Sequence, residues 1–259
     1  MNELHVGLDT KVVIPDGGCL HIDDEWPDYE PWHLKFDPRK HHFNPLLGID
    51  MKRAKELARV LYSVAPEGSD TLTVRNGRRA LARLLLTYKR LDRMERWLEK
   101  KGQDEELSPA HAEVLGMLSE IMFSDVLPQV LCSSRKEFSF NPNTVILARI
   151  NRQELGDDDA LALVFFLLNH YKGQVVVRDF GFYGRNEHIR LIREKRLVAQ
   201  VDTLEGMPER LVQNLLLMKS KFAKNANFKD AELIARNSGL KPDFLREDNE
   251  YNKFIKDAM

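Results

Sequence analysis

The stretch Gly173-Gln-Val-Val-Val-Arg-Asp-Phe-Gly-Phe-Tyr183, followed by a charged segment and then by Leu197-Val-Ala-Gln-Val-Asp-Thr203, decides the fold. Each of the two stretches contains a short continuous apolar run, which is typical of a buried strand. The charged segment between them predicts a helix over residues 185–196. A strand, a helix and a second strand in this order are typical of a parallel sheet covered by helices. The first strand therefore delivers a carboxylate, Asp179, directly after its end.

The rest of the chain predicts one α/β domain interrupted by helices. Strands are predicted at residues 11–14, 34–36, 144–148, 174–177 and 197–201. Helices are predicted from residue 51 and over residues 76–101, 109–126, 157–171, 185–196, 209–224 and 229–237. We therefore predict an α/β fold with a mostly parallel sheet, formed by residues 1–50 and 133–259, and a helical insertion at residues 51–132.

The charges of the chain nearly cancel, because 39 Lys and Arg residues face 40 Asp and Glu residues among 259. Attraction of the whole molecule to nucleic acid is excluded, and any such binding must come from a local patch. The cysteines, Cys19 and Cys132, lie far apart without metal-ligand spacing, which predicts small buried residues in a reducing compartment. No apolar run approaches the roughly 20 residues that span a bilayer, and no signal pattern opens the sequence. We expect a cytoplasmic protein that makes no membrane contact.

Several catalytic motifs are missing from the sequence. No G-x-x-x-x-G-K-[ST] segment occurs, so the backbone cradle and the lysine that bind nucleotide phosphates have no candidate. A Gly-x-Ser-x-Gly elbow, a Cys-His pairing and a Gly-rich dinucleotide fingerprint are also missing. The sequence therefore favours a protein that is not an enzyme and uses no cofactor. The alternative is that ATP and magnesium bind with a phosphate loop from another chain.

Three short segments carry a resemblance to a known family. They are Phe43-Asn-Pro-Leu46, the strand that leads into Asn151-Arg-Gln-Glu-Leu-Gly156, and Val175-Val-Val-Arg-Asp179. With the helical region between them, they resemble the FtsK/HerA-type P-loop ATPases that pump DNA, and among these the type IV coupling proteins of conjugation. The resemblance covers most of the chain from about residue 11 onward. It implies a P-loop-ATPase-like sheet with a helical insertion and an association with DNA translocation.

The resemblance gives Asp179 the position of the carboxylate that ends the Walker B strand and holds a magnesium-bound water. Members of the family usually carry a second acidic residue directly after it, and here that residue is Phe180. The missing phosphate loop and the missing second acid both argue against hydrolysis. From the residues alone an alternative is favoured, in which Asp179 caps the turn that contains Gly181.

The resemblance also implies roles for residues that follow. Arg193 and Arg196 would present a basic group to the nucleotide or to a neighbouring subunit, although mixed charges at helical spacing also fit a solvated helix face. Gln200 would be the polar sensor at the tip of the next strand, unless Asp202 or Thr203 takes that place. The candidate catalytic residues are therefore Asp179, Arg196 and Gln200.

A second candidate site is basic and lies within residues 75–93. The basic residues there are Arg75, Arg78, Arg79, Arg83, Lys89, Arg90 and Arg93, against the single acid Asp92. A helix face of this kind can track nucleic-acid phosphates. We predict DNA binding through Arg79, Arg83 and Arg90. The alternative is that these arginines lie against acids from elsewhere, such as the Asp104-Glu-Glu106 loop.

Possible metal ligands gather in the first fifty residues, namely Asp16, His21, Asp23, Asp24, Glu25, His33, Asp37, His41 and His42. Nothing in their spacing demands convergence, so loops and turns are predicted in preference to a metal site. The sequence thus predicts a degenerate, non-hydrolysing, motor-like accessory protein associated with DNA or a DNA-translocation assembly. Two alternatives stay open: an ATPase completed by another chain, or an inhibitor or assembly factor that binds a motor or a nucleic-acid enzyme. The partners would be DNA, a motor-type protein or further copies of the chain in an oligomer.

Overall fold

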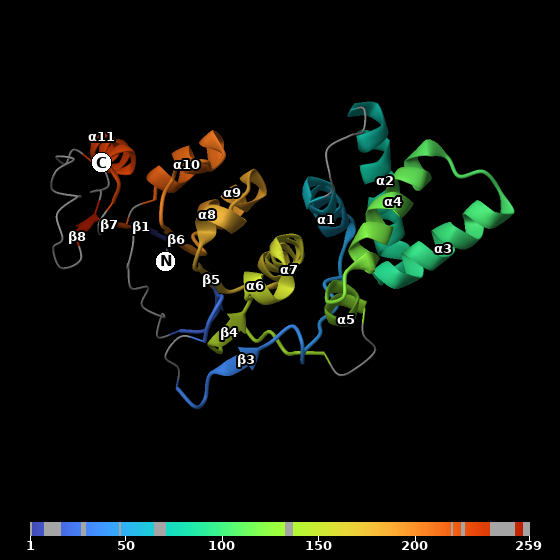
Figure 1. Ribbon diagram of the computed structural model, residues 1–259, viewed down its shortest axis with the longest axis horizontal. Coiled ribbons are helices and arrows are strands. Elements are labelled where there is room, and N and C mark those ends of the chain that lie inside the picture. The colour runs from blue at the N-terminus through green and yellow to red at the C-terminus, as the bar shows by residue number, and fades with distance from the viewer. Residues whose placement is uncertain are drawn as a thin grey trace. The chain divides into compact units, whose positions relative to one another are not determined.

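The computed structural model describes residues 2–7, 17–26, 30–46, 48–64, 71–132, 137–218, 220–223, 226–238 and 252–255. The strands are β1 (Glu3–Val6), β2 (Cys19–Asp23), β3 (Leu34–Phe36), β4 (Ile146–Arg149), β5 (Gln174–Val177), β6 (Leu197–Val201), β7 (Ser220–Ala223) and β8 (Asn252–Ile255). The helices are α1 (Met51–Val64), α2 (Thr71–Tyr88), α3 (Leu91–Asp104), α4 (Pro109–Phe123), α5 (Leu127–Cys132), α6 (Arg152–Leu155), α7 (Asp157–His170), α8 (Phe180–Tyr183), the 3-10 helix η1 (Asn186–His188), α9 (Ile189–Arg193), α10 (Glu209–Leu216) and α11 (Phe228–Ser238). Figure 1 shows these elements along the chain.

The strands form one eight-stranded sheet in the order β3-β4-β2-β5-β6-β1-β7-β8. Parallel pairing joins β4 to β2, β2 to β5, β5 to β6, β6 to β1 and β1 to β7, whereas β8 pairs antiparallel with β7. The predicted α/β class with a mostly parallel sheet is therefore confirmed. Because β2, β5 and β6 run in the same direction, their last residues lie on the same side of the sheet, which we call the carboxyl side.

The apolar runs of β5 and β6 are buried along nearly their full length, as expected for parallel strands covered on both faces. The predicted helix over residues 209–224 is wrong in its second half, because α10 ends at Leu216 and β7 follows. The pattern of β7 alternates between half-buried and buried residues, which has the period of a strand. The strand predicted at residues 11–14 lies outside the described residues.

Two long predicted helices are interrupted in the structure. The helix predicted over residues 76–101 is two helices, because Lys89 has a φ of 54° and a residue in this left-handed conformation cannot continue a right-handed helix. The helix predicted over residues 185–196 is reduced to η1 and α9. There, the Nδ1 atom of His188 accepts a hydrogen bond from the backbone N–H of Arg185 at 3.0 Å and satisfies the first turn. Lys195, with a φ of 55°, lies beyond the end of α9.

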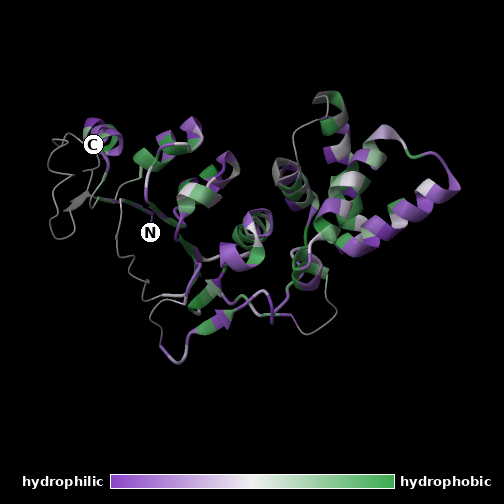
Figure 2. Cartoon of the chain, viewed as in Figure 1, coloured by the Kyte–Doolittle hydropathy of each residue, from purple (hydrophilic) through white to green (hydrophobic). Residues whose placement is uncertain are grey.

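The chain forms two compact units. The sheet unit comprises Met1–Lys35, Phe140–Asn151 and Tyr171–Met259, and the helical unit comprises Phe36–Ser139 and Arg152–His170. In Figure 2 the hydrophobic colour runs along much of α7, of which every residue from Ala162 to Asn169 is buried, whereas α3 is mainly hydrophilic. The sequence-based boundaries of a helical insertion at residues 51 and 132 stay a prediction.

Throughout the described part of the chain, every helix is too short or too polar to cross a lipid bilayer. Cys19 and Cys132 are both buried free thiols, and burial raises the pKa of each to about 11. They therefore suit the predicted role of small core residues.

Candidate functional site

The carboxyl side of the sheet holds a buried ion pair. Asp23 is the last residue of β2, and Arg178 directly follows the neighbouring strand β5. The Arg178 guanidinium lies 3.2 Å from the Asp23 carboxylate, which is 3% exposed, whereas the arginine side chain itself is half exposed. The backbone reinforces the contact, because the N–H of Arg178 donates to the carbonyl of Ile22 at 3.0 Å.

Burial dominates the electrostatics of this pair. Desolvation raises the pKa of Asp23 to about 6, and although the attraction of Arg178 acts to lower it, the net shift is upward. His21 precedes it by two residues on the same face of β2, with its Nε2 atom 3.7 Å from the carboxylate. Burial, together with the charge of Arg178, lowers the pKa of His21 to about 4, so this imidazole is neutral near pH 7.

Two of the three predicted catalytic residues lie on this same side of the sheet. Asp179 follows Arg178 and begins α8 with a φ of 54°, and its side chain makes no capping hydrogen bond to that helix. The geometry therefore does not support the alternative in which the Asp179 side chain caps this turn. Gln200 is buried in β6, opposite His5 of β1. Gln200 lies inside the strand, so the polar residues that directly follow the end of β6 are Asp202 and Thr203.

Arg196 lies on the opposite side of the sheet, because it immediately precedes β6. Its guanidinium donates hydrogen bonds to the backbone carbonyls of Tyr171 at 2.7 Å and Gly173 at 2.9 Å. These bonds join the turn before β5 to the turn before β6. The structure thus brings Arg196 together with backbone carbonyls and does not bring it together with Asp179 or Gln200.

Other histidines and acids of the first fifty residues, outside β2, serve local turns. The N–H of Asp37 donates to the Nδ1 atom of His41 at 3.0 Å, and the N–H of Glu30 donates to Nδ1 of His33 at 3.3 Å. Among the residues that the structure describes, no three His, Cys, Asp or Glu side chains gather in a way that could hold a metal ion. Asp16 lies outside the described residues.

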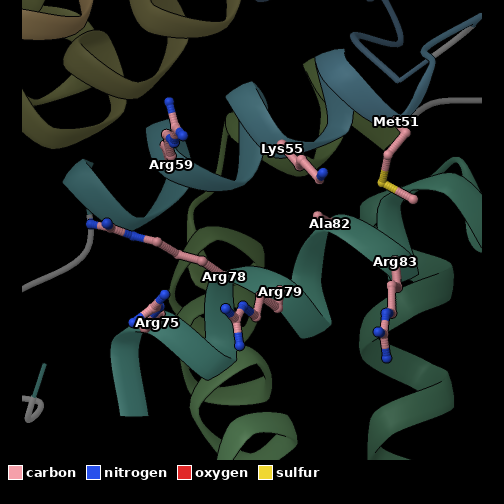
Figure 3. Close-up of a pocket in the computed structure, with 8 residues that line it drawn as sticks. All are labelled: Met51, Lys55, Arg59, Arg75, Arg78, Arg79, Ala82 and Arg83. Carbon is pink, nitrogen blue, oxygen red and sulfur yellow. The ribbon is translucent and has the colours of Figure 1, made fainter. Parts of the chain in front are cut away.

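A cavity of about 760 Å³ in the helical unit is formed by α1 and α2 and is lined mainly by basic residues. Its lining residues are Met51, Lys55 and Arg59 from α1 and Arg75, Arg78, Arg79, Ala82 and Arg83 from α2. Figure 3 shows Met51 and Lys55 on α1 pointing toward Ala82 on α2, with the arginines distributed around them. Six cationic side chains therefore line the cavity together with the apolar Met51 and Ala82, and no acidic residue among those that the structure describes contributes to the lining. We call this set of eight residues the basic cavity.

The helices that form the basic cavity approach closely at one point. A Cβ atom at Gly77 on α2 would overlap the hydroxyl group of Tyr62 on α1, so glycine at this position permits the contact. The Arg78 guanidinium lies over the Tyr62 ring at 5.8 Å from its centroid, which holds that cation at the junction of the two helices.

The charges of the basic cavity are not neutralised from within. None of the six cationic side chains forms an ion pair with any acid in the described part of the chain. The predicted alternative partners at residues 104–106 do not line the cavity, and Glu105 among them pairs with Lys101. The spacing also sets like charges together, since Lys55 and Arg59, Arg75 and Arg79, and Arg79 and Arg83 are each four residues apart.

Like charges at this helical spacing destabilise a helix by about 0.2–0.5 kcal/mol per pair. Three such pairs in one small region therefore oppose folding unless an anion neutralises them. The cavity can hold an anionic ligand with several negative charges, because planar guanidinium groups bind phosphate or carboxylate oxygens in pairs.

The structure places Arg90, the third predicted DNA-binding residue, away from the basic cavity. Arg90 lies between α2 and α3, and its guanidinium binds both carboxylate oxygens of Asp92, at 2.9 and 3.0 Å. It also donates a hydrogen bond to the carbonyl of Cys132. Arg90 therefore does not share one helix with Arg79 and Arg83, because α2 ends at Tyr88. Lys55 and Arg59, which sequence reasoning missed, complete the site instead.

Comparison with known proteins identifies solved structures with a similar fold, but no family or curated protein with a similar sequence. No known protein family matches the sequence, and no curated protein matches it. Among solved structures, VirB4 of Thermoanaerobacter pseudethanolicus is similar with a TM-score of 0.64 and 13% identity, over 100% of this chain and 89% of that one. The bacterial conjugative coupling protein TrwB, solved without its first 70 residues and in complex with sulphate, is similar with a TM-score of 0.61 and 11% identity, over 99% of this chain and 83% of that one. An unbound form of TrwB gives a TM-score of 0.62.

These neighbours have the P-loop ATPase fold, so the predicted P-loop-ATPase-like sheet and the resemblance to coupling proteins are confirmed at the level of the fold. The likeness covers nearly the whole chain, including the helical unit. Fold similarity alone assigns no activity, because function lives in the site.

Proposed function

We propose that this protein is a motor-like accessory factor of a DNA-transfer assembly that binds DNA through the basic cavity and does not hydrolyse ATP. The observation that carries the proposal is the set of six cations around the cavity, none of which pairs with an acid among the residues that the structure describes, in a chain whose total charge is close to neutral. The similarity to VirB4 and to the coupling protein TrwB supports the link with DNA transfer.

Phosphates are the ligands that suit this arrangement. Guanidinium groups donate paired hydrogen bonds to phosphate oxygens, and each neutralised phosphate releases condensed counterions. Arg75, Arg79 and Arg83 repeat every four residues along α2, so they form a row that can follow successive phosphates of one strand. Lys55 and Arg59 line the same cavity from α1, which lets the cavity contact DNA from two helices.

The chemistry of the carboxyl side supports the absence of hydrolysis. The sequence contains no phosphate loop, and between β1 and β2 the described residues form no helix that could present backbone N–H groups to phosphates. The Asp23 carboxylate is bound by Arg178, and the residue after Asp179 is the fully buried Phe180. These features support the part of the proposal that excludes hydrolysis of a magnesium-bound nucleotide.

The DNA-binding proposal is tested by titrating the protein into a fluorescein-labelled 20-base-pair duplex and measuring anisotropy at several salt concentrations. If all six cations contact phosphates, log affinity falls against log salt with a slope of about −5, from about −0.9 per contact. The double variant Arg79→Glu with Arg83→Glu should bind at least about tenfold more weakly, with a slope less steep by about 2.

The matched control is the double variant Arg93→Glu with Lys100→Glu, which changes the net charge equally on exposed positions of α3 outside the basic cavity. This control should bind DNA nearly as the parent does. Equal weakening by both double variants, or a salt slope near zero for the parent, would contradict binding through the cavity.

The absence of hydrolysis is tested by measuring phosphate release from ATP and magnesium, with and without the duplex. We expect no release above the background without protein. A turnover of about 1 s⁻¹, an ordinary enzyme rate, that disappears in Asp179→Ala would refute this part of the proposal and favour an ATPase completed between chains.

A further inference from the structure

A second cavity in the helical unit has the opposite charge. It measures about 400 Å³ and is formed by α1, the α4–α5 turn and α7. Its lining residues are Leu61, Met117, Glu120, Ile121, Phe123, Ser124, Leu127, Asp158, Asp159 and Ala162. Six of these are apolar, three are acidic and none is basic. We call this set of ten residues the acidic groove.

The apolar part of the acidic groove consists of a buried floor and one projecting aromatic side chain. Leu61, Leu127 and Ala162 are each at most 4% exposed, whereas Phe123 at the end of α4 is 91% exposed. Burying a phenylalanine side chain stabilises a protein or a complex, because apolar surface is removed from water. Phe123 therefore leaves a large apolar surface that a partner can cover.

The groove is held in shape by its own hydrogen bonds. Ser124 donates from its hydroxyl to the Asp159 carboxylate at 2.5 Å and accepts hydrogen bonds from the N–H groups of Val126 and Leu127 at 3.1 and 2.9 Å. These bonds fix the turn between α4 and α5 against α7. A partner would meet a surface that is already formed, so little conformational entropy is lost on binding.

The acids at the rim make the groove selective for positive charge. Glu120 and Asp158 are exposed, and neither forms an ion pair with any residue that the structure describes. Asp159 is partly buried beside them, and desolvation followed by the negative charges of Asp158 and Asp125 raises its pKa. DNA is repelled by this rim, so the acidic groove requires a ligand of a different kind from that of the basic cavity.

We propose that the acidic groove binds a basic amphipathic helix of a partner protein. Apolar residues on one face of such a helix would cover Phe123 and the floor, and its Lys and Arg residues would pair with Glu120 and Asp158. Helices of other proteins commonly dock in this way, with anchors at i, i+3, i+4 and i+7 in a hydrophobic groove. The complementary charges restrict the choice of partner, because an acidic helix would set like charges together.

The probe is a labelled 18-residue peptide with Leu at the anchor positions and Lys at the others, compared with a twin in which every Lys is Glu. Anisotropy should show saturable binding of the Lys peptide alone. Phe123→Ala should weaken it at least about tenfold, as expected for an aromatic anchor, and Glu120→Gln with Asp158→Asn should weaken it and reduce its salt dependence. Leu217→Ala, which truncates a comparably exposed apolar side chain in the sheet unit, should have no effect.

A second measurement locates the peptide. A photoreactive benzophenone side chain placed at position 123 should crosslink to the Lys peptide. Equal binding of both peptides, unchanged binding by Phe123→Ala, or the absence of a crosslink would overturn the proposal. DNA binding by Phe123→Ala should equal that of the parent, so a failure of this inference is distinguishable from a failure of the proposed function.

Discussion

Replacing Asp23 with Asn should stabilise the protein at neutral pH. The carboxylate is almost fully buried, and its pKa is raised from 3.8 to about 6 because desolvation outweighs the attraction of Arg178. Asn has nearly the same shape and carries no charge. Its amide oxygen can still accept the hydrogen bond that Arg178 donates to the carboxylate.

The magnitude follows from the shift in pKa. Each pKa unit corresponds to about 1.4 kcal/mol, so a shift of about two units makes the ionised carboxylate cost about 3 kcal/mol near pH 7.5. Because the pKa is raised in the folded state, the stability contributed by Asp23 is complete below about pH 3.8 and is lost as the pH rises through about 6. The advantage of the Asn variant should therefore fall to about 1 kcal/mol near pH 4.5.

The assay is urea unfolding of the parent and of Asp23→Asn at pH 4.5 and pH 7.5, followed by far-UV circular dichroism. The difference in the free energy of unfolding between the two proteins should be larger by about 2 kcal/mol at the higher pH. Asp202→Asn is the control, because Asp202 follows β6 on the same side of the sheet and is exposed. This control should change the free energy of unfolding by less than about 0.5 kcal/mol, as is usual for a substitution at an exposed position.

Two results would refute the reasoning. A lower stability of Asp23→Asn at pH 7.5 would mean that the ion pair with Arg178 outweighs the cost of burial. A difference that is the same at both pH values would mean that the titration of Asp23 does not contribute to stability.

Two further substitutions test the packing of the two units by thermal unfolding. Gly18→Ala should lower the free energy of unfolding by about 1–3 kcal/mol, because the added Cβ would overlap the backbone of residues 142–144. Gly116→Ala, the control, lies in an exposed position of α4 with nothing nearby and should raise the free energy of unfolding by up to about 1 kcal/mol. Equal effects of the two substitutions would contradict the tight contact at Gly18. Arg90→Ala should cost about 1–3 kcal/mol, because it removes charged hydrogen bonds to Asp92 in the first turn of α3 and to the carbonyl of Cys132 at the end of α5. Arg93→Ala on the exposed face of α3 should cost less than about 0.5 kcal/mol.

The strands that the sequence predicted well are those whose residues are uniformly apolar. β5 and β6 are read directly from their Val, Leu and Ala residues, since both faces of a parallel strand are buried. β1 and β2 escaped prediction because His5 and His21 interrupt their apolar pattern. His5 is nevertheless buried, where its ring stacks on Phe222 at a centroid distance of 4.5 Å. A polar residue inside a strand is explained by its neighbours in space, which a single sequence does not contain.

The candidate site was predicted only in part, for a related reason. The arginines of α2 stand out in the sequence because they recur along one helix. Lys55 and Arg59 gain significance only when α1 packs against α2. The break at Lys89 moves Arg90 out of this row. It depends on a left-handed backbone conformation of the lysine, which no sequence motif predicts.

The short strands at the two ends of the sheet affect how the protein behaves in concentrated solution. An open sheet edge offers unpaired N–H and C=O groups to a second molecule, which is a common route to aggregation. β8 covers β7 by antiparallel pairing, and β3 at the other end has only three residues. A chain that lacked residues 252–255 would keep its parallel core and expose the hydrogen-bonding groups of β7. Turbidity that increases with protein concentration would then appear before any loss of helical signal.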